Sequence, residues 1–302
     1  MSAPSGPKPP IIDYEASTYR TDFWQGQGRE YEDAVERVAL RRLLPPTGER
    51  LVDIGAGFGR LADLYAGYRQ VVLVDYSQSQ LEYARQQLGD ERFIYVAADL
   101  YRLPLATGAV DAAVMVRVLH HIAHVPAAMQ QLARILTPQG ALVLEFANKR
   151  HFKNIARYLL GRGVNPFAQE PYEFAELHYD FHPAWVRARL IEAGFQVEAR
   201  RSVSLLRTGF LKRRVPTRWL VAVDAALQRP TAALAPAPSQ FVRARAALPS
   251  VRGVTGAVPV ARQRLFRCPA CGHEPLIEEA DAVVCRQCQE RWPIVNGVYV
   301  FK

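Results

Sequence analysis

Short apolar runs alternate with segments of helical periodicity along the first half of the chain. The segments with apolar residues at helical spacing are 31–44, 58–65, 78–88 and 126–136. The apolar runs that predict strands are 50–54, 71–75, 93–97, 110–116 and 141–146. Because strands and helices alternate through short connections, this pattern predicts an α/β fold with a parallel sheet covered on both faces.

The pattern is less regular in the second half. Residues 161–182 form a long stretch that contains Pro, Gly and acidic residues, and we expect it to act as a lid. A basic amphipathic helix is expected within an insertion at 208–236, which separates the last two strands. The remaining predicted elements are helices at 151–160 and 183–193 and strands at 195–206 and 240–245.

The composition is that of a globular protein, with 49% hydrophobic and 22% charged residues. The chain contains no stretch of about 18 uncharged apolar residues, which a membrane-spanning helix would need. Residues 1–10 lack the apolar segment of a signal peptide. We therefore expect a soluble, cytoplasmic protein that at most contacts a membrane from its surface.

The net charge of +9 comes from one segment of the chain. Residues 200–267 contain 14 Arg and Lys against a single acid, Asp224. A partner attracted by charge should therefore bind this segment. A solvated cationic surface without a partner explains the same pattern equally well.

A glycine cluster follows the first predicted strand, in the sequence Leu51-Val-Asp-Ile-Gly-Ala-Gly-Phe-Gly-Arg60. Glycines at such a turn let the backbone approach a ligand closely, and dinucleotide-binding enzymes use a similar turn. Here the spacing is G-x-G-x-G rather than G-x-G-x-x-G. Asp53 also lies inside the strand, Asp75 ends the following strand, and Asp99 follows the third. These features argue against a dinucleotide enzyme.

With these motifs the chain resembles the class I methyltransferases that use S-adenosylmethionine (SAM), in particular the branch that includes the quinone-biosynthesis enzymes. The resemblance covers residues 14–245, and the segments that carry it are 53–60, 74–77, 98–104, 118–122 and 136–142. It implies a Rossmann-like domain with a seven-stranded sheet. It also implies an enzyme that transfers a methyl group from SAM.

The resemblance further implies which residues bind SAM. The backbone of residues 55–59 would lie against its methionine and ribose, Asp75 would accept from both ribose hydroxyls, and Tyr76 would pack on the adenine. Asp99 would accept from the adenine amino group, and Arg117 would line the methionine end. Helix capping or strand-end solvation is the alternative role of the two acids. The expected cofactor-binding residues are Asp53, Gly55, Ala56, Gly57, Gly59, Asp75, Tyr76, Asp99, Leu100 and Arg117.

Methyl transfer from SAM asks little of side chains, because the methyl sulfonium is already activated and the protein mainly aligns it with the acceptor. A general base is needed only when the acceptor atom is protonated. The candidate bases are His121, His178 and His182. His121 can alternatively shape the loop after the fourth strand, and His182 can cap the following helix.

All four cysteines lie in two C-x-x-C pairs separated by 13 residues, which is the spacing of a zinc ribbon. Four thiolates leave no open position on the metal, so the Zn²⁺ would be structural. A rubredoxin-like iron site is the alternative. The expected ligands are Cys268, Cys271, Cys285 and Cys288. Together with residues 292–299, they resemble the small zinc-ribbon proteins that activate RNA and protein methyltransferases in trans.

These patterns divide the chain into four parts. They are an N-terminal tail and cofactor-covering segment (1–29), a methyltransferase domain (30–247), a linker (248–263) and a zinc ribbon (264–302). The zinc ribbon could dock RNA, contact a second copy in a homo-oligomer, or brace the large domain.

Two acceptor classes remain open. A small-molecule or lipid-like acceptor is favoured by the family branch and by the basic amphipathic helix, which could lie on an anionic membrane. RNA is favoured by the basic segment beside the zinc ribbon. A non-catalytic SAM-binding scaffold is a third hypothesis, and the complete set of cofactor motifs argues against it.

Overall fold

The computed structural model describes residues 10–13, 15, 28–247 and 264–302. The linker expected at 248–263 and most of the expected N-terminal tail lie outside these residues.

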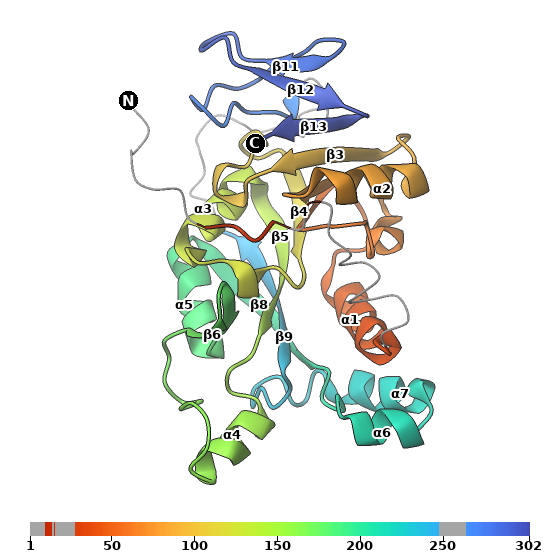
Figure 1. Ribbon diagram of the computed structural model, residues 1–302, viewed down its shortest axis with the longest axis vertical. Coiled ribbons are helices and arrows are strands. Elements are labelled where there is room, and N and C mark those ends of the chain that lie inside the picture. Colours follow the sequence, from red (N-terminus) through yellow and green to blue (C-terminus); the bar gives the residue numbers. More distant parts are fainter. Residues whose placement is uncertain (1–9, 14, 16–27, 248–263) are drawn as a thin grey trace.

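One large mixed sheet forms the centre of the molecule (Figure 1). Seven of its strands are neighbours in the order β3-β2-β1-β4-β5-β9-β8. Neighbours from β3 to β5 are parallel, whereas β9 is antiparallel to both β5 and β8. This order confirms the predicted Rossmann-like α/β fold, and it reverses between β1 and β4, where such sheets bind ligands. The bounds are β1 (Gly48–Ile54), β2 (Tyr68–Asp75), β3 (Phe93–Ala98), β4 (Val110–Met115), β5 (Leu136–Ala147), β8 (Phe195–Val203) and β9 (Ser239–Ala246).

Helices cover both faces of the sheet, as predicted. Val35 and Leu81 belong to the core on the face covered by α1 and α2, and Met129 and Leu190 to the core under α3 and α5. The strands between these cores are nearly continuous apolar runs because both of their faces are buried. Among the described residues, no helix is long and apolar enough to cross a membrane. The bounds are α1 (Glu30–Leu43), α2 (Gln78–Leu88), α3 (Val125–Ile135) and α5 (Pro183–Glu192).

The helix predicted at residues 58–65 does not form. Turns follow β1, and the only helical piece there is the short 3-10 helix η2 (Ala62–Tyr65). Gly57 and Gly59 have φ angles of +52° and +78°, and these left-handed conformations interrupt helical geometry. The prediction of this helix was wrong because it followed the spacing of the apolar residues and gave too little weight to the glycines.

Strand β5 begins at Leu136, earlier than the strand predicted at 141–146. Leu136 pairs with Val110 of β4, and the next pair joins Ala141 to Ala112, so the intervening residues form an irregularity in the ladder. A strand can include such an insertion as a bulge without ending.

The basic insertion contains two helices instead of one. They are α6 (Gly209–Arg214) and α7 (Thr217–Leu227). Pro216 is the N-cap of α7, and the separation follows because a proline ring disfavours helical geometry in the residue before it. The inner side of α7 contacts α1, where the Tyr31 hydroxyl donates to the buried carboxylate of Asp224 at 2.6 Å.

The segment predicted as a lid follows α4 (Phe152–Leu159) and contains a short hairpin of β6 (Tyr172–Ala175) and β7 (His178–Asp180). The hairpin lies beside the 3-10 helix η4 (Leu119–His121), which follows β4. A further 3-10 helix, η3 (Leu100–Arg102), follows β3.

Residues 264–302, which we call the C-terminal module, add four strands to the same sheet (Figure 1). Strand β13 runs parallel to β3 and aligns Val298–Phe301 with Tyr95–Ala98, so the sheet has eleven strands among the described residues. Asn296 and Gly297 form the hairpin turn indicated by the sequence. The bounds are β10 (Ile277–Glu278), β11 (Ala282–Val284), β12 (Arg291–Val295) and β13 (Val298–Phe301).

Candidate active site

A cavity of about 120 Å³ opens where the carboxyl ends of β1, β2, β3 and β4 meet. An adjoining hollow of about 50 Å³ shares Gly55, Gly57 and Arg117 with it. Four strands far apart in the sequence therefore supply one elongated site, as their parallel order requires. The predicted residues that line the two hollows are Asp53, Gly55, Ala56, Gly57, Asp75, Tyr76, Leu100, Arg117 and His121.

Two glycines in the loop after β1 shape this cavity. Gly55 has a φ of +72°, and a Cβ there would lie 2.2 Å from Cγ2 of Val118. Gly57 has a φ of +52°, and a Cβ there would meet no atom within 4 Å, so a side chain would project into the open site. Glycine is needed at both positions because a side chain at either one would clash or occupy ligand space.

Asp75 is held in place by backbone donors on both of its oxygens. Oδ2 accepts from the Gly57 N–H at 2.7 Å, and Oδ1 accepts from the Ser77 N–H at 2.9 Å. Burial raises the pKa of Asp75, and these backbone hydrogen bonds oppose that rise. The carboxylate is therefore held in a fixed orientation at the edge of the cavity.

Two predicted cofactor residues lie outside these hollows. Asp99 caps η3 by accepting from the Tyr101 N–H at 2.8 Å, which is the alternative role considered from the sequence. Gly59 has a φ of +78° and faces Leu88 and Ala84 of α2. Its absent side chain lets the loop pass close to that helix.

A contact between the C-terminal module and the cavity was not visible in the sequence. Lys302 follows β13; its Nζ lies 4.6 Å from the ring centroid of Tyr76 and donates to the Tyr76 carbonyl at 2.8 Å. The same Nζ lies 3.5 Å from Glu15, which accepts from the N–H groups of Gln78 and Ser79 at the start of α2. Residues 10–12, just before Glu15, line the cavity. Lys302 thus joins Tyr76 to the N-terminal wall of the site.

Replacement of Lys302 by alanine is expected to raise the KM for SAM about fivefold and to leave kcat nearly unchanged. The change removes the cation–π contact between Lys302 and Tyr76, worth about 1 kcal/mol, and Tyr76 lies in the wall of the cavity. Lys302→Arg should restore most of the affinity, and Arg286→Ala, which removes an exposed charge elsewhere in the module, is the matched control. Steady-state kinetics with varied SAM would check this, and an unchanged KM for Lys302→Ala would contradict it.

Asp53 is a buried acid that lines the smaller hollow. It is 3% exposed, and the Tyr65 hydroxyl donates to its Oδ2 at 2.8 Å. Burial raises the pKa of Asp53 to about 7, although the hydrogen bond from Tyr65 and the nearby Arg60 lower it. The Asp53 carboxyl is therefore partly protonated near neutral pH when no ligand is bound.

The affinity for SAM is expected to rise about five- to tenfold between pH 6 and pH 7.5. The ligand is a cation, so it favours the ionised form of Asp53, and that form becomes populated as the pH passes the raised pKa. This range lies below the ordinary pKa of the ligand's own α-amino group. Calorimetry should also show proton release on binding near pH 7. For Asp53→Asn the affinity should be independent of pH in this range, and an equally steep rise in that variant would refute the assignment.

Arg117 is positioned by two buried acids. Its backbone, with a φ of +61°, donates to Glu145 at 2.8 Å, and its guanidinium pairs with Glu36 of α1. Glu36 is 1% exposed and also pairs with Arg60 at 3.1 Å. The Ser239 hydroxyl donates to Glu145 at 2.6 Å. The sequence did not single out Glu36. Its only visible feature there was an acidic residue next to the apolar positions of a predicted helix.

His121 and His178 come together beside the cavity, with ring centroids 4.7 Å apart. His121 Nδ1 lies 3.1 Å from the Leu177 carbonyl, which can only accept, so Nδ1 carries the proton and Nε2 holds the lone pair. Burial lowers the pKa of His121 to about 4, and the ring is therefore neutral at pH 7. Nε2 of His121 can therefore accept a proton, although burial makes the ring a weak base.

His182 does not join the other two histidines. It is the N-cap of α5, where its Nδ1 accepts from the Ala184 N–H at 3.2 Å. It lines a separate cavity on the other side of β5, together with Phe146 and Arg150. This arrangement favours the capping role over catalysis.

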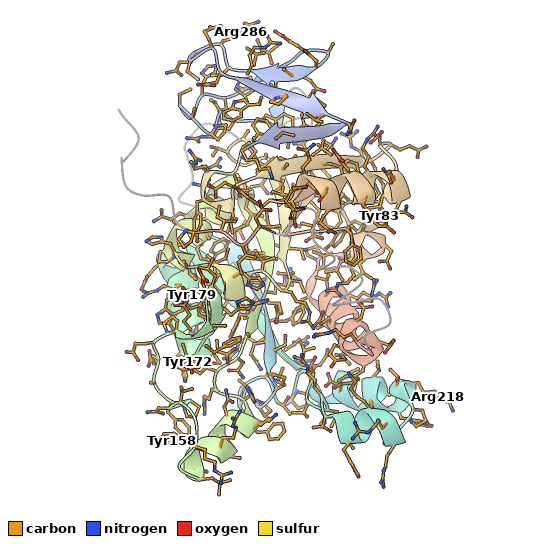
Figure 2. The ribbon with its side chains drawn as sticks, viewed as in Figure 1. Tyr83, Tyr158, Tyr172, Tyr179, Arg218 and Arg286 are labelled. Atoms are coloured by element: carbon orange, nitrogen blue, oxygen red, sulfur yellow. The ribbon has the colours of Figure 1, made fainter. Side chains whose placement is uncertain are left out.

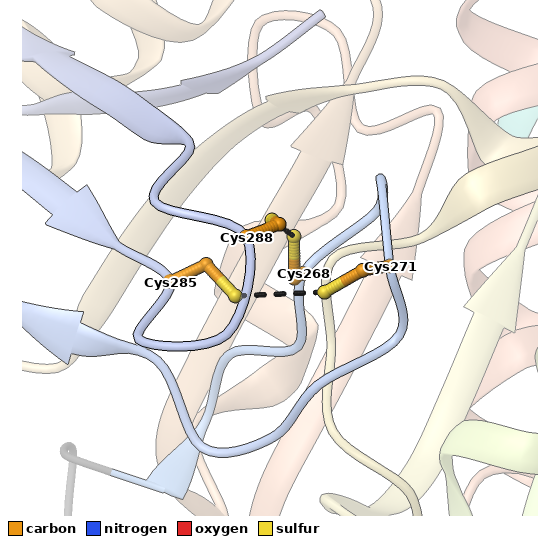
Figure 3. Close-up of side chains that lie close together, drawn as sticks. All are labelled: Cys268, Cys271, Cys285 and Cys288. Atoms are coloured by element: carbon orange, nitrogen blue, oxygen red, sulfur yellow. Dashed lines mark hydrogen bonds between the residues drawn. The ribbon is translucent and has the colours of Figure 1, made fainter.

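The four cysteines converge at one point of the C-terminal module (Figure 3). All four Sγ atoms lie within 4.8 Å of one another, with Cys268 and Cys288 at 3.6 Å and Cys271 and Cys285 at 3.5 Å. Tetrahedral Zn²⁺ with Zn–S bonds of about 2.3 Å places sulfurs about 3.8 Å apart, whereas a disulfide needs about 2.05 Å. The sulfur positions fit a single four-coordinate metal ion.

The comparisons with known proteins agree with this geometry. Residues 52–144 match the family model described as "Methyltransferase domain". A demethylmenaquinone methyltransferase of Clavibacter sepedonicus is 33% identical over 148 residues, which are 48% of this chain and 59% of that protein. The chain thus covers less than two thirds of that relative.

Solved structures share the fold at low sequence identity. A SAM-dependent methyltransferase from Mesorhizobium loti aligns with a TM-score of 0.55 and 23% identity, over 71% of this chain and 99% of that one. A methyltransferase solved in complex with the Haloferax volcanii Trm112 activator aligns with a TM-score of 0.55 and 17% identity, over 76% and 96%. The family match, the strand order and the cavity lined by Gly55, Gly57 and Asp75 together identify this chain as one that carries a class I SAM-dependent methyltransferase domain.

Proposed function

We propose that this protein transfers a methyl group from SAM to a small-molecule or lipid-like acceptor. The observation that carries the proposal is the cavity in which the Gly55–Gly57 loop, the fixed carboxylate of Asp75 and Arg117 meet. The demethylmenaquinone methyltransferase relative supports an acceptor of this class.

When bound, SAM supplies an activated methyl group on a positively charged sulfur. The chain's own residues bind and orient the donor. The Gly55–Gly57 backbone gives room for close approach, Asp75 accepts the ribose hydroxyls, and Asp53 offers a negative charge near the cationic end. Alignment for in-line displacement then accounts for most of the rate.

His121 is the group best placed to take a proton from the acceptor. It lines the cavity, is neutral at pH 7, and has its lone pair at Nε2. A base with so low a pKa assists most when the acceptor is itself acidic, such as a phenol or an activated carbon. His178 packs against its ring and orients it.

We further propose that the four cysteines hold a structural Zn²⁺. Cys268, Cys271, Cys285 and Cys288 would supply four thiolates, so the ion would have no open position for chemistry. Its role would be to hold the C-terminal module in the shape that places β13 on β3.

RNA is the second candidate acceptor. It is supported by the cationic insertion. Against it, the exposed side chains of the insertion include aliphatic groups that neither stack on bases nor pair with phosphates.

The test uses the purified protein, methyl-labelled SAM and a cell extract fractionated into RNA, protein, lipid and small molecules. Label in the lipid or small-molecule fraction, absent with Asp75→Ala, is the expected result. Label in RNA would replace the proposal by the RNA alternative. Absence of label in every fraction, with SAM binding intact, would instead indicate a SAM-binding scaffold.

A further inference from the structure

Helix α4 presents apolar side chains to solvent although it belongs to a folded protein. None of its residues is buried, and Phe152 and Leu159 are 48% and 74% exposed. The C-cap residue Leu160 is 73% exposed. Exposed apolar groups are common singly, but several on one short helix mark a contact surface. The same segment carries the exposed cations Lys153 and Arg157.

Helices α6 and α7 form a second lobe with the same character. Phe210 and Trp219 are 58% and 57% exposed, and each lies under an arginine: Arg214 is 4.8 Å from the Phe210 ring, and Arg218 is 5.8 Å from the Trp219 ring. The inner side of α7 is anchored to α1 through the buried Asp224. The opposite side of α7 therefore faces away from α1 and carries the exposed side chains.

The two lobes are joined by the turn that follows α7. The Phe152 N–H, at the start of α4, donates to the Pro236 carbonyl at 2.9 Å. The side chain of Asn148 donates to the carbonyls of Ala235 and Ala237, both at 2.8 Å. Leu234, which lies in this turn, is 69% exposed.

Figures 1 and 2 show that both lobes lie at the end of the molecule opposite the C-terminal module. Tyr158 of α4 and Arg218 of α7 are near this end, and Arg286 of the module is at the other. We call the surface formed by residues 150–162 and 207–236 the basal face.

The basal face is almost free of negative charge. Its two segments contain ten Arg and Lys and one acid, Asp224, which is fully buried. Two of these cations, Arg207 and Lys212, pair with the buried Glu32 of α1. Beside the turn at Leu234, a cavity of about 150 Å³ is lined by Arg150, Arg187 and Arg200 over an apolar floor. Cations therefore surround both the exposed apolar side chains and the adjoining hollow.

We propose that the basal face docks on an anionic lipid bilayer, with Leu159, Leu160 and Trp219 entering the interface and the arginines contacting lipid phosphates. Exposed apolar residues bordered by cations are the pattern of proteins that lie on such surfaces, where aromatic side chains prefer the headgroup level. The inference deepens the proposed function, on which it rests, by bringing the protein to a lipid-like acceptor.

Two other occupants fit the observations less well. A second copy of the chain, related by a two-fold axis, would place one cationic surface against an identical one, and like charges would oppose the contact. RNA would use the arginines and aromatic rings but leave Leu159, Leu160 and Leu234 without a partner.

The test measures sedimentation of the full-length protein with vesicles of phosphatidylcholine alone or with about 30% phosphatidylglycerol. We expect binding to the anionic vesicles that is at least tenfold stronger than to the neutral ones. The double variant Leu159→Glu/Leu160→Glu and the variant Trp219→Glu should each lose at least tenfold in this binding. All three side chains are exposed, so the fold should tolerate the changes.

Ile191→Glu is the matched control, because Ile191 is a 54% exposed aliphatic residue of α5 outside the basal face. It should bind vesicles like the unchanged protein. Equal binding to both vesicle types, no binding, or equal losses in control and test variants would overturn the docking surface. Self-association of the protein that the Glu variants abolish would also overturn the docking surface. RNA that displaces the protein from vesicles, through contacts with the arginines alone, would overturn it too.

SAM binding, measured by calorimetry, separates this inference from the proposed function. The Glu variants should bind SAM normally, since they lie far from the cavity. Lipid labelling without vesicle binding would reject only the docking surface. Vesicle binding without any methyl transfer would reject only the proposed function.

Discussion

Replacing Cys285 by serine is expected to lower the melting temperature by about 10 °C and to remove bound zinc. Structural zinc contributes about 10 kcal/mol or more to folding in small zinc modules, and a serine hydroxyl is a poor substitute for a thiolate ligand. For a chain of 302 residues, a loss of about 6 kcal/mol, which is part of that contribution, lowers the melting temperature by about 10 °C. Calorimetry and metal analysis of the purified variant would check the result.

The effect should extend beyond the C-terminal module, because the module completes the sheet of the large domain. Strand β13 covers the edge of β3, and Phe266 packs against the rings of Tyr299 and Phe301 at 4.7 and 5.2 Å. Unfolding of the module would expose that edge, so we also expect the variant to aggregate on heating.

Gln287→Ser is the matched control, because Gln287 lies between Cys285 and Cys288 and its side chain is exposed. It should keep both the zinc and the melting temperature. A Cys285→Ser protein that retained one zinc per chain and its stability would show that the four sulfurs do not act as one metal site.

Replacing Asp75 by alanine is expected to weaken SAM binding by 100- to 1000-fold. A carboxylate that accepts two hydroxyls makes two charge-assisted hydrogen bonds of about 1.5 to 3 kcal/mol each. The variant also frees the N–H of Gly57, so the glycine loop loses a contact that fixes its shape. Titration calorimetry with SAM would measure the loss.

Asp111→Ala provides the matched control for this experiment. Asp111 also accepts from two backbone groups, the N–H of Glu49 at 2.8 Å and of Arg50 at 2.9 Å, but it does not line the cavity. Its replacement should lower stability and leave the affinity for SAM unchanged. If both variants lost affinity equally, Asp75 would act through the fold rather than through the ligand.

The sequence by itself determined the central sheet and much of the lining of the candidate site. Asp53, Gly55 and Gly57 are close neighbours in the chain, and Asp75 ends the next strand. Strands in a parallel sheet bring their carboxyl ends to one edge, so local motifs at strand ends predict one site. The two C-x-x-C pairs predicted a metal site for a similar reason, since each pair is local and no cysteine remains unassigned.

Only the tertiary structure decided how distant segments meet. β13 pairs with β3, Lys302 contacts Tyr76, and Glu36 pairs with Arg117, although the partners lie far apart in the chain. Edge strands accept any strand with a suitable face, and long charged side chains reach many positions, so neither leaves a periodic signal. The basal face is of the same kind. The sequence predicted a helix at 151–160 and a basic amphipathic helix within the insertion at 208–236. Only the folded chain determined which side of each helix stayed exposed and that both segments lie at one end.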